Sequence, residues 1–177
     1  MKFVTLALLL LPIAVAAYEI GDPVDDIVLT DLEGLPVALS DHAGEIIVLN
    51  FFATWCPGCN EEAGVLEAEI WQVYRDRGLS VIAIDIQEPV GLVQGWALAH
   101  DVTYHIWMAP DWSVLEPFTD GPALPYNTVI DRDQVLRYSQ IGFDRDAIIA
   151  MIETIFDEDP TPVTASTWSD VKGLYRR

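Results

Sequence analysis

The stretch Ile46-Ile47-Val48-Leu49-Asn50-Phe51-Phe52-Ala53-Thr54-Trp55-Cys56-Pro57-Gly58-Cys59 decides the fold of this chain. Its first part, residues 46–53, is almost wholly apolar, which is typical of a strand buried on both faces of a sheet. A helix is predicted from about Pro57 to Arg75, because proline suits a first helical turn and apolar residues recur at helical spacing after it. The two cysteines, the only two in the chain, therefore lie where a strand passes into a helix.

This position predicts different roles for the two thiols. The unpaired N–H groups and partial positive charge of a helix N-terminus stabilise a thiolate, which makes Cys56 the predicted nucleophile. Cys59 lies one turn inside the helix, where it can attack a mixed disulfide formed at Cys56 and release the partner. Two other interpretations stay open, half of a zinc site and a static structural disulfide. Zinc would need further ligands, and the three histidines are scattered along the chain.

The first 17 residues have the pattern of a secretory signal peptide. Lys2 precedes an apolar stretch that Pro12 interrupts and that ends in Val15-Ala16-Ala17, whose small residues suit cleavage. We therefore expect an exported protein, periplasmic or extracellular, with an uncleaved N-terminal membrane anchor as the alternative. In an oxidising compartment a lone pair of cysteines favours a redox site over a structural staple.

The rest of the chain has the length of one domain, residues 18–157, followed by a tail, residues 158–177. The chain has 28 Asp and Glu against 9 Lys and Arg, a net charge of −19, which disfavours binding to nucleic acid or to an anionic membrane. The acidic surface serves solubility or attracts a basic partner. We expect a monomer, and a tail that docks on its own domain through Trp168, Leu174 and Tyr175.

The patterns outside the cysteine stretch predict a small α/β domain. Residues 27–30 and 35–39 flank turn-forming residues and are typical of a hairpin. Residues 79–85 form a second buried strand, and the order strand, helix, strand implies a right-handed parallel crossover. Further along, we predict a helix at 90–100, a strand at 104–108, a short turn or helix at 112–118, a loop at 122–125, a hairpin at 128–139 and a helix at 144–157.

Several motifs together resemble the thioredoxin fold, and more closely the exported TlpA- and ResA-like thiol–disulfide oxidoreductases. The likeness covers roughly residues 20–157. It rests on Leu29-Thr30-Asp31-Leu32-Glu33-Gly34, Leu39-Ser40-Asp41-His42-Ala43-Gly44, the stretch from Leu49 to Cys59, and Leu124-Pro125-Tyr126-Asn127-Thr128-Val129-Ile130-Asp131. The resemblance implies an α/β, thioredoxin-like three-layer sandwich: a central mixed sheet of four or five strands flanked by helices, with an N-terminal β-hairpin extension and an exposed Cys56.

The same resemblance implies an enzyme that exchanges disulfides with protein thiols or disulfides, more as a reductant than as an oxidant. Its redox centre is the Cys56/Cys59 disulfide, with no other cofactor. A membrane or soluble electron donor resets the pair, and cytochrome c maturation proteins are candidate partners.

The resemblance also assigns a substrate-binding surface around the disulfide. Pro125 matches the family's cis-proline, which faces the disulfide and offers backbone groups to an extended substrate segment. Leu124 before it adjusts that contact. Trp55, Pro57 and Gly58 belong to the same predicted surface.

Acidic residues near the thiols are the predicted proton acceptors. Asn50 stands six residues before Cys56, where thioredoxin carries a buried acid, and TlpA- and ResA-like proteins also tend to have asparagine there. Their alternative acid matches Glu88, which we expect to take the proton from Cys59 if burial raises its pKa; a solvated loop acid is the alternative. Glu62 matches another acid common in the family, with a capping or solvated residue as its alternative.

Two rival functions fit the sequence less well. Peroxiredoxins need Pro-x-x-x-Thr/Ser-x-x-Cys, and the matching positions here are Leu49 and Ala53. The copper-handling branch of the fold uses a wider Cys-x-x-x-Cys spacing together with a histidine. This chain has neither that spacing nor a histidine in an obvious matching context, so we predict no metal site. A metal-handling or partner-docking module remains the non-enzymatic alternative.

Overall fold

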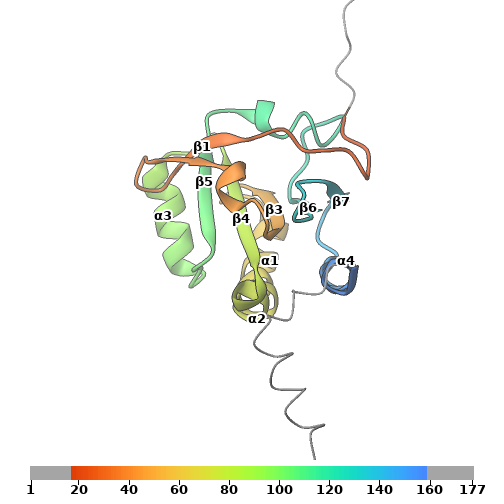
Figure 1. Ribbon diagram of the computed structural model, residues 1–177. Helices are drawn as coiled ribbons and strands as arrows, with labels where there is room; N and C mark the ends of the chain where they lie inside the picture. The colour runs from red at the N-terminus through yellow and green to blue at the C-terminus, as the bar shows by residue number, and fades with distance from the viewer. Residues whose placement is uncertain (1–16, 159–177) are drawn as a thin grey trace, which may run out of the picture.

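A computed structural model describes residues 17–158 (Figure 1). The predicted signal peptide, apart from Ala17, and the predicted tail, apart from Glu158, lie outside the described residues. Within residues 17–158 no helix is long and apolar enough to cross a membrane. The chain forms one sheet of seven strands in the order β2-β1-β5-β4-β3-β6-β7. The strands are β1 (Val28–Asp31), β2 (Pro36–Ala38), β3 (Ile46–Phe52), β4 (Leu79–Ile86), β5 (His105–Ala109), β6 (Tyr126–Ile130) and β7 (Leu136–Ile141).

The helix after the cysteine motif is continuous but not uniform. It changes from α-helical to π-helical pairing at Leu66 and ends at Gly78, whose φ of 85° only glycine adopts easily. Its parts are α1 (Pro57–Val65), η2 (Leu66–Trp71), α2 (Gln72–Tyr74) and η3 (Arg75–Arg77). The other helical elements are η1 (Leu39–His42), α3 (Val90–Ala99), η4 (Trp112–Val114) and α4 (Arg145–Glu158).

The sheet has the predicted mixed topology. β3 pairs with β4, and β4 with β5, in parallel, whereas β6 is antiparallel to β3. The β1–β2 hairpin pairs with β5 along Thr30 and Asp31. The predicted thioredoxin-like α/β fold and the N-terminal hairpin are confirmed. Five strands, β5-β4-β3-β6-β7, form the central sheet, as expected, and the hairpin adds β1 and β2 to its edge.

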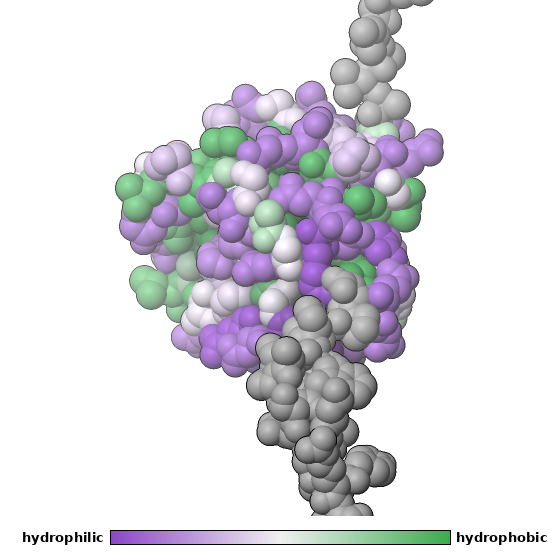
Figure 2. All heavy atoms as spheres, in the orientation of Figure 1, coloured by the Kyte–Doolittle hydropathy of each residue, from purple (hydrophilic) through white to green (hydrophobic). Residues whose placement is uncertain are grey.

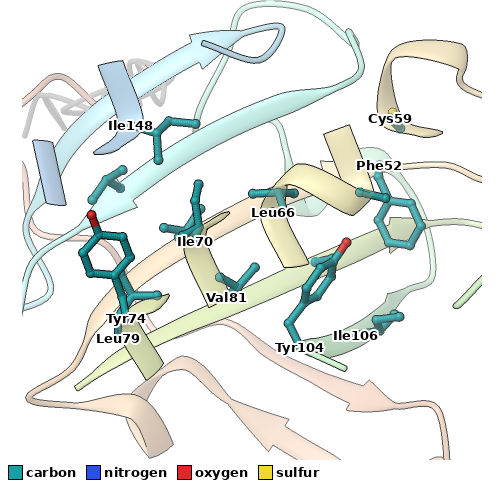
Figure 3. Close-up of a cluster of buried hydrophobic side chains, with 14 of the residues drawn as sticks. Phe52, Cys59, Leu66, Ile70, Tyr74, Leu79, Val81, Tyr104, Ile106 and Ile148 are labelled. Atoms are coloured by element: carbon teal, nitrogen blue, oxygen red, sulfur yellow. The ribbon is translucent and has the colours of Figure 1, made fainter. Parts of the chain in front are cut away.

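The two faces of the sheet are covered differently. All three longer helices pack on one face, through residues such as Ala63, Val93 and Ile152. Figure 3 shows this cluster, with Cys59 and Phe52 together at one end. The opposite face is covered by residues on 3-10 turns and loops, among them Leu39, Leu115 and Phe118. The segment after β5 thus forms part of the second outer layer and leads back to the site.

One face of the molecule is mainly hydrophilic, as Figure 2 shows, in keeping with the acidic composition. Apolar side chains gather at its left margin, where α3 lies in Figure 1. On that helix Val90, Leu92 and Leu98 are exposed.

Candidate active site

The two cysteines form a disulfide at the entrance of α1. Their Cα atoms are 5.3 Å apart. Cys56 is the N-cap residue, and its sulfur accepts a hydrogen bond from the backbone N–H of Cys59 at 3.2 Å. Pro57 follows at the first helical position, where its missing N–H leaves no gap in the helical hydrogen bonds. The backbone donors of the first turn therefore converge on Cys56.

Both cysteines are buried in this disulfide form. Cys56 is 3% exposed and Cys59 is 1% exposed, so the expectation of an exposed Cys56 is wrong for this state. The reason is packing: both residues belong to the same buried cluster as Phe52 and Ala63. The neighbouring Trp55 is instead 65% exposed.

The predicted proline faces the disulfide motif. The Leu124–Pro125 peptide bond is cis, as the resemblance implied. A Cβ atom placed on Gly58 would lie 3.2 Å from Cδ of Pro125, so the backbone of the motif and the proline ring are in close approach. Leu124 packs against buried residues of both clusters. Pro125 thus lies against the cysteine motif, whereas the contact of these residues with substrate stays a prediction.

Glu88 holds the loop that precedes Cys56. Its Oε2 accepts the backbone N–H of Thr54 at 2.6 Å and its Oε1 accepts the hydroxyl of Thr54 at 2.7 Å. Glu88 is half-buried, so it is not a freely solvated loop acid. Both of its oxygens serve the loop, which makes it a positioning residue in this state. Its predicted role as proton acceptor for Cys59 stays a prediction.

A second carboxyl group, that of Asp85, lies behind Glu88. Asp85 is the next-to-last residue of β4, follows Val81-Ile82-Ala83-Ile84, and has no solvent exposure. Its Oδ1 accepts the N–H of Glu88 at 3.0 Å, whereas its Oδ2 has no hydrogen-bond partner among the described residues. Burial, reinforced by the neighbouring Glu88 carboxyl group, raises the pKa of Asp85 to about 7. Asp85 is therefore a proton-sensitive group behind the active-site loop.

Glu62 lies on the helical side of the disulfide, one turn after Cys59. It is 2% exposed, so the alternative of a solvated residue is wrong. Its carboxyl oxygens accept the side-chain amides of Asn50 at 2.6 Å and Asn127 at 3.1 Å. Burial raises the pKa of Glu62 to about 7, and the two amide hydrogen bonds oppose this rise only in part.

Asn50 is not itself an acid, but its side-chain amide donates a hydrogen bond to the buried acid Glu62. It pairs across the sheet with Asn127, to whose side-chain oxygen it also donates at 3.1 Å. The buried acid comes from α1 and meets this amide pair. Tyr104 completes the surroundings: its hydroxyl has no partner among residues 17–158, and burial together with the charge of Glu62 raises its pKa. In Figure 3 this hydroxyl points toward the helix that carries Leu66.

The exposed Trp55 lines a hollow of about 720 Å³ beside the motif. Its other walls come from Ala17 and from the segment between β5 and Pro125. Sequence reasoning did not identify this surface, because the segment has no regular pattern.

Residues 17–158 contain no group of three or more His, Cys, Asp or Glu side chains arranged to hold a metal ion.

Comparison with known proteins gives one family and many similar folds. The model of the AhpC/TSA family matches residues 20–139. The thiol-disulfide oxidoreductase ResA of Geobacillus kaustophilus (strain HTA426) is 33% identical over 117 residues, 66% of each chain. The ResA of Bacillus cereus (strain ZK / E33L) is 30% identical over 115 residues, 65% of each chain. The chain thus spans just under two thirds of the length of these relatives.

Solved structures support the same fold. A DsbF homologue from Corynebacterium diphtheriae has a TM-score of 0.69 at 22% identity, over 76% of this chain and 87% of that one. A thiol:disulfide interchange protein of the thioredoxin family from Chlorobium tepidum TLS has a TM-score of 0.67 at 21% identity, over 78% and 99%. The predicted thioredoxin-like fold and the likeness to ResA-like proteins are confirmed.

Proposed function

Because the chain belongs to the AhpC/TSA family and holds its disulfide at a helix entrance, we propose that it is an exported thiol–disulfide oxidoreductase that reduces disulfides of protein partners. The observation that carries this proposal is the convergence of Cys56, the N–H of Cys59 and the cis-Pro125 at one point. The oxidoreductase relatives support the class of reaction.

The reaction runs through one mixed disulfide. In the reduced protein the Cys56 thiolate attacks one sulfur of the partner disulfide, and the other partner sulfur leaves as a thiolate. The Cys59 thiol then loses its proton, attacks the sulfur of Cys56 and releases the second partner thiolate. Two electrons have passed to the partner, and the chain is left with its disulfide. A dithiol donor restores the starting state.

The proton from Cys59 needs an acceptor near the second cysteine. Glu62 is one turn from Cys59 on the same helix, and a pKa near 7 suits a base that must pick up and return a proton. We assign this role to Glu62. The alternative acceptor, Glu88, lies off the helix of Cys59 and holds the loop before Cys56 through Thr54.

Export and the reducing direction are two separate parts of this proposal. The signal-peptide pattern of residues 1–17 favours an oxidising compartment, periplasmic or extracellular. A reductant there depends on an electron donor, in a membrane or in solution. A dithiol site that such a donor keeps reduced can in turn reduce protein disulfides. Precursors of c-type cytochromes are therefore candidate substrates.

The peroxidase alternative is disfavoured at two positions. Leu49 and Ala53 stand where a peroxiredoxin needs proline and a hydroxyl side chain, and both are fully buried in apolar surroundings. Neither residue can donate a hydrogen bond from its side chain to a bound peroxide. Hydrogen peroxide should therefore be a poor substrate.

Trapping tests the assigned order of attack. Cys59→Ala should accumulate mixed disulfides with a disulfide-bonded protein such as insulin, because resolution is blocked. Cys56→Ala should trap none. If alkylation of the reduced protein at neutral pH labels Cys59 first, the assignment of the nucleophile is wrong; if neither variant traps substrate and the wild type does not reduce insulin, the proposed function is wrong.

A further inference from the structure

A hollow beside the disulfide has features that the reaction alone does not explain. It is about 720 Å³ in volume, and its walls include Trp55, Trp112, Leu115, Glu116, Asp120 and Pro122. We call this hollow the Trp55 groove.

The Trp55 groove lies between the two segments that flank the disulfide. One wall is Trp55, the residue directly before Cys56, so their Cα atoms are about 3.8 Å apart. The other wall, residues 112–122, runs into the cis Leu124–Pro125 bond, and Pro125 approaches Gly58. A polypeptide seated in the groove is therefore directed toward the sulfur of Cys56.

Within residues 17–158, the groove offers an apolar surface at Trp55. The Trp55 side chain is 65% exposed and makes no hydrogen bond or ring contact with the described residues. Leu115, by contrast, is 1% exposed and anchors the opposite wall in the core. A large side chain left in solvent next to a hollow is typical of a binding surface.

The charges at the groove are of one sign. Glu116 and Asp120 are exposed at its wall. The basic residues of the described chain are five arginines, and none of them lines the groove. They lie on η3, on the β6–β7 hairpin and on α4: Arg75, Arg77, Arg132, Arg137 and Arg145. The groove is thus complementary to a cationic segment with a large apolar side chain.

We propose that the Trp55 groove binds the substrate segment next to its reactive cysteine, and that it selects extended segments carrying Lys or Arg together with an aromatic or large aliphatic residue. This proposal rests on the proposed function and names its substrate class. Trp55 and Trp112 receive the apolar side chain, while Glu116 and Asp120 receive the cation. The neutral disulfide bond itself is handled by Cys56 and Pro125 and needs neither acid.

Two matched peptides test the selection with the reduced full-length protein. Each carries a single cysteine bound to a chromogenic thionitrobenzoate group. One has Arg and Phe beside the cysteine, and the other has Glu and Ser in the same places. The wild type should have a kcat/KM for the cationic peptide at least about tenfold higher, mainly through KM, and the ratio should fall as salt is added.

The variant Glu116→Gln/Asp120→Asn should lose most of this preference by raising KM for the cationic peptide. The control Glu33→Gln/Glu61→Gln removes two exposed acids that lie outside the groove and should keep the preference. An absent preference, one that survives in the groove variant, or one lost equally in the control overturns the proposal.

An uncharged small disulfide, hydroxyethyl disulfide, separates this proposal from the proposed function. Both double variants should reduce it as fast as the wild type. If the wild type reduces it and shows no peptide preference, only the groove proposal fails. If the wild type does not reduce it at all, the proposed function fails.

Discussion

Glu62 should make the stability of this protein fall as the pH rises from about 5 to about 8, and Glu62→Gln should remove that part of the fall. The ordinary pKa of this side chain is 4.5, and burial in the folded chain raises it to about 7. The folded state therefore binds more protons than the unfolded state between these two values. Because deprotonation is easier in the unfolded chain, each rise in pH through this window favours unfolding.

The expected magnitude follows from the two pKa values. A tenfold difference in an acid constant corresponds to about 1.4 kcal/mol, so complete deprotonation of Glu62 lowers the free energy of unfolding by about 3 kcal/mol. Most of this, about 2–3 kcal/mol, falls between pH 5 and pH 8. The substitution also removes one acceptor oxygen from Asn50 or Asn127, which adds a cost of about 1 kcal/mol that does not change with pH.

The assay is urea unfolding of the disulfide form, followed by tryptophan fluorescence, at a series of pH values. The stability of Glu62→Gln minus that of the wild type should rise by about 2–3 kcal/mol between pH 5 and pH 8. Asp85 titrates in the same range in both proteins, so its effect cancels in this difference. Glu61→Gln, the exposed neighbour, is the control and should give a flat difference. A flat difference for Glu62→Gln as well would refute the burial of an acid with a raised pKa.

Substitutions at three further positions distinguish positioning from chemistry. The Glu88→Gln side chain can still accept the N–H of Thr54 and donate to its hydroxyl, so this variant should keep most of the rate of mixed-disulfide release. Glu88→Ala should slow this release about tenfold. Equal losses for both variants in single-turnover assays would instead make Glu88 the proton acceptor. Asp85→Asn keeps the acceptor for the N–H of Glu88 and removes the buried charge. In urea unfolding this variant should be more stable than the wild type by about 1–3 kcal/mol at pH 8 and nearly equal to it at pH 5. Greater stability at pH 5 only would contradict this. Gly58→Ala gains about 0.5–1 kcal/mol of helix propensity, but its Cβ would lie 3.2 Å from Pro125, so thermal stability should change little. The kcat/KM for peptide disulfides should fall more than that for hydroxyethyl disulfide. Equal losses for both substrates would place the effect on the disulfide itself.

The fold was predictable because its main signals are local. Three local signals each specify one element: the apolar run of β3, the proline at the start of α1 and the second apolar run of β4. Their order implies a right-handed crossover between the two strands. The predicted boundaries differ from those of the structure by only one or two residues at most ends. The cysteines sit at the junction of two such elements, so their place in the site was predictable too.

The acids were harder to predict because their state depends on distant residues. Glu62 follows Cys59 by three residues and so shares its helix face, which was a usable signal. Its burial, however, needs Asn50 and Asn127, which are 77 positions apart and meet only in the sheet. Asp85 lies in an apolar run whose alternation gives no warning of a buried carboxyl. A general expectation that charged residues are exposed therefore failed at both positions.

The two carboxyl sites divide the work of the proposed reaction between geometry and proton transfer. Asp85 and Glu88 act through backbone and hydroxyl groups of the loop before Cys56, so their influence falls on where the nucleophile is held. Glu62 lies one turn after Cys59 on the same helix and accepts hydrogen bonds from two side-chain amides, which cannot take its proton, so its proposed influence falls on the proton that resolution must remove. A loop that is held too loosely slows attack and release alike, because both steps use the sulfur of Cys56. A missing base slows release alone. The ratio of attack rate to release rate is therefore the quantity that separates the two sites, and it should change with Glu62→Gln but not with Glu88→Ala.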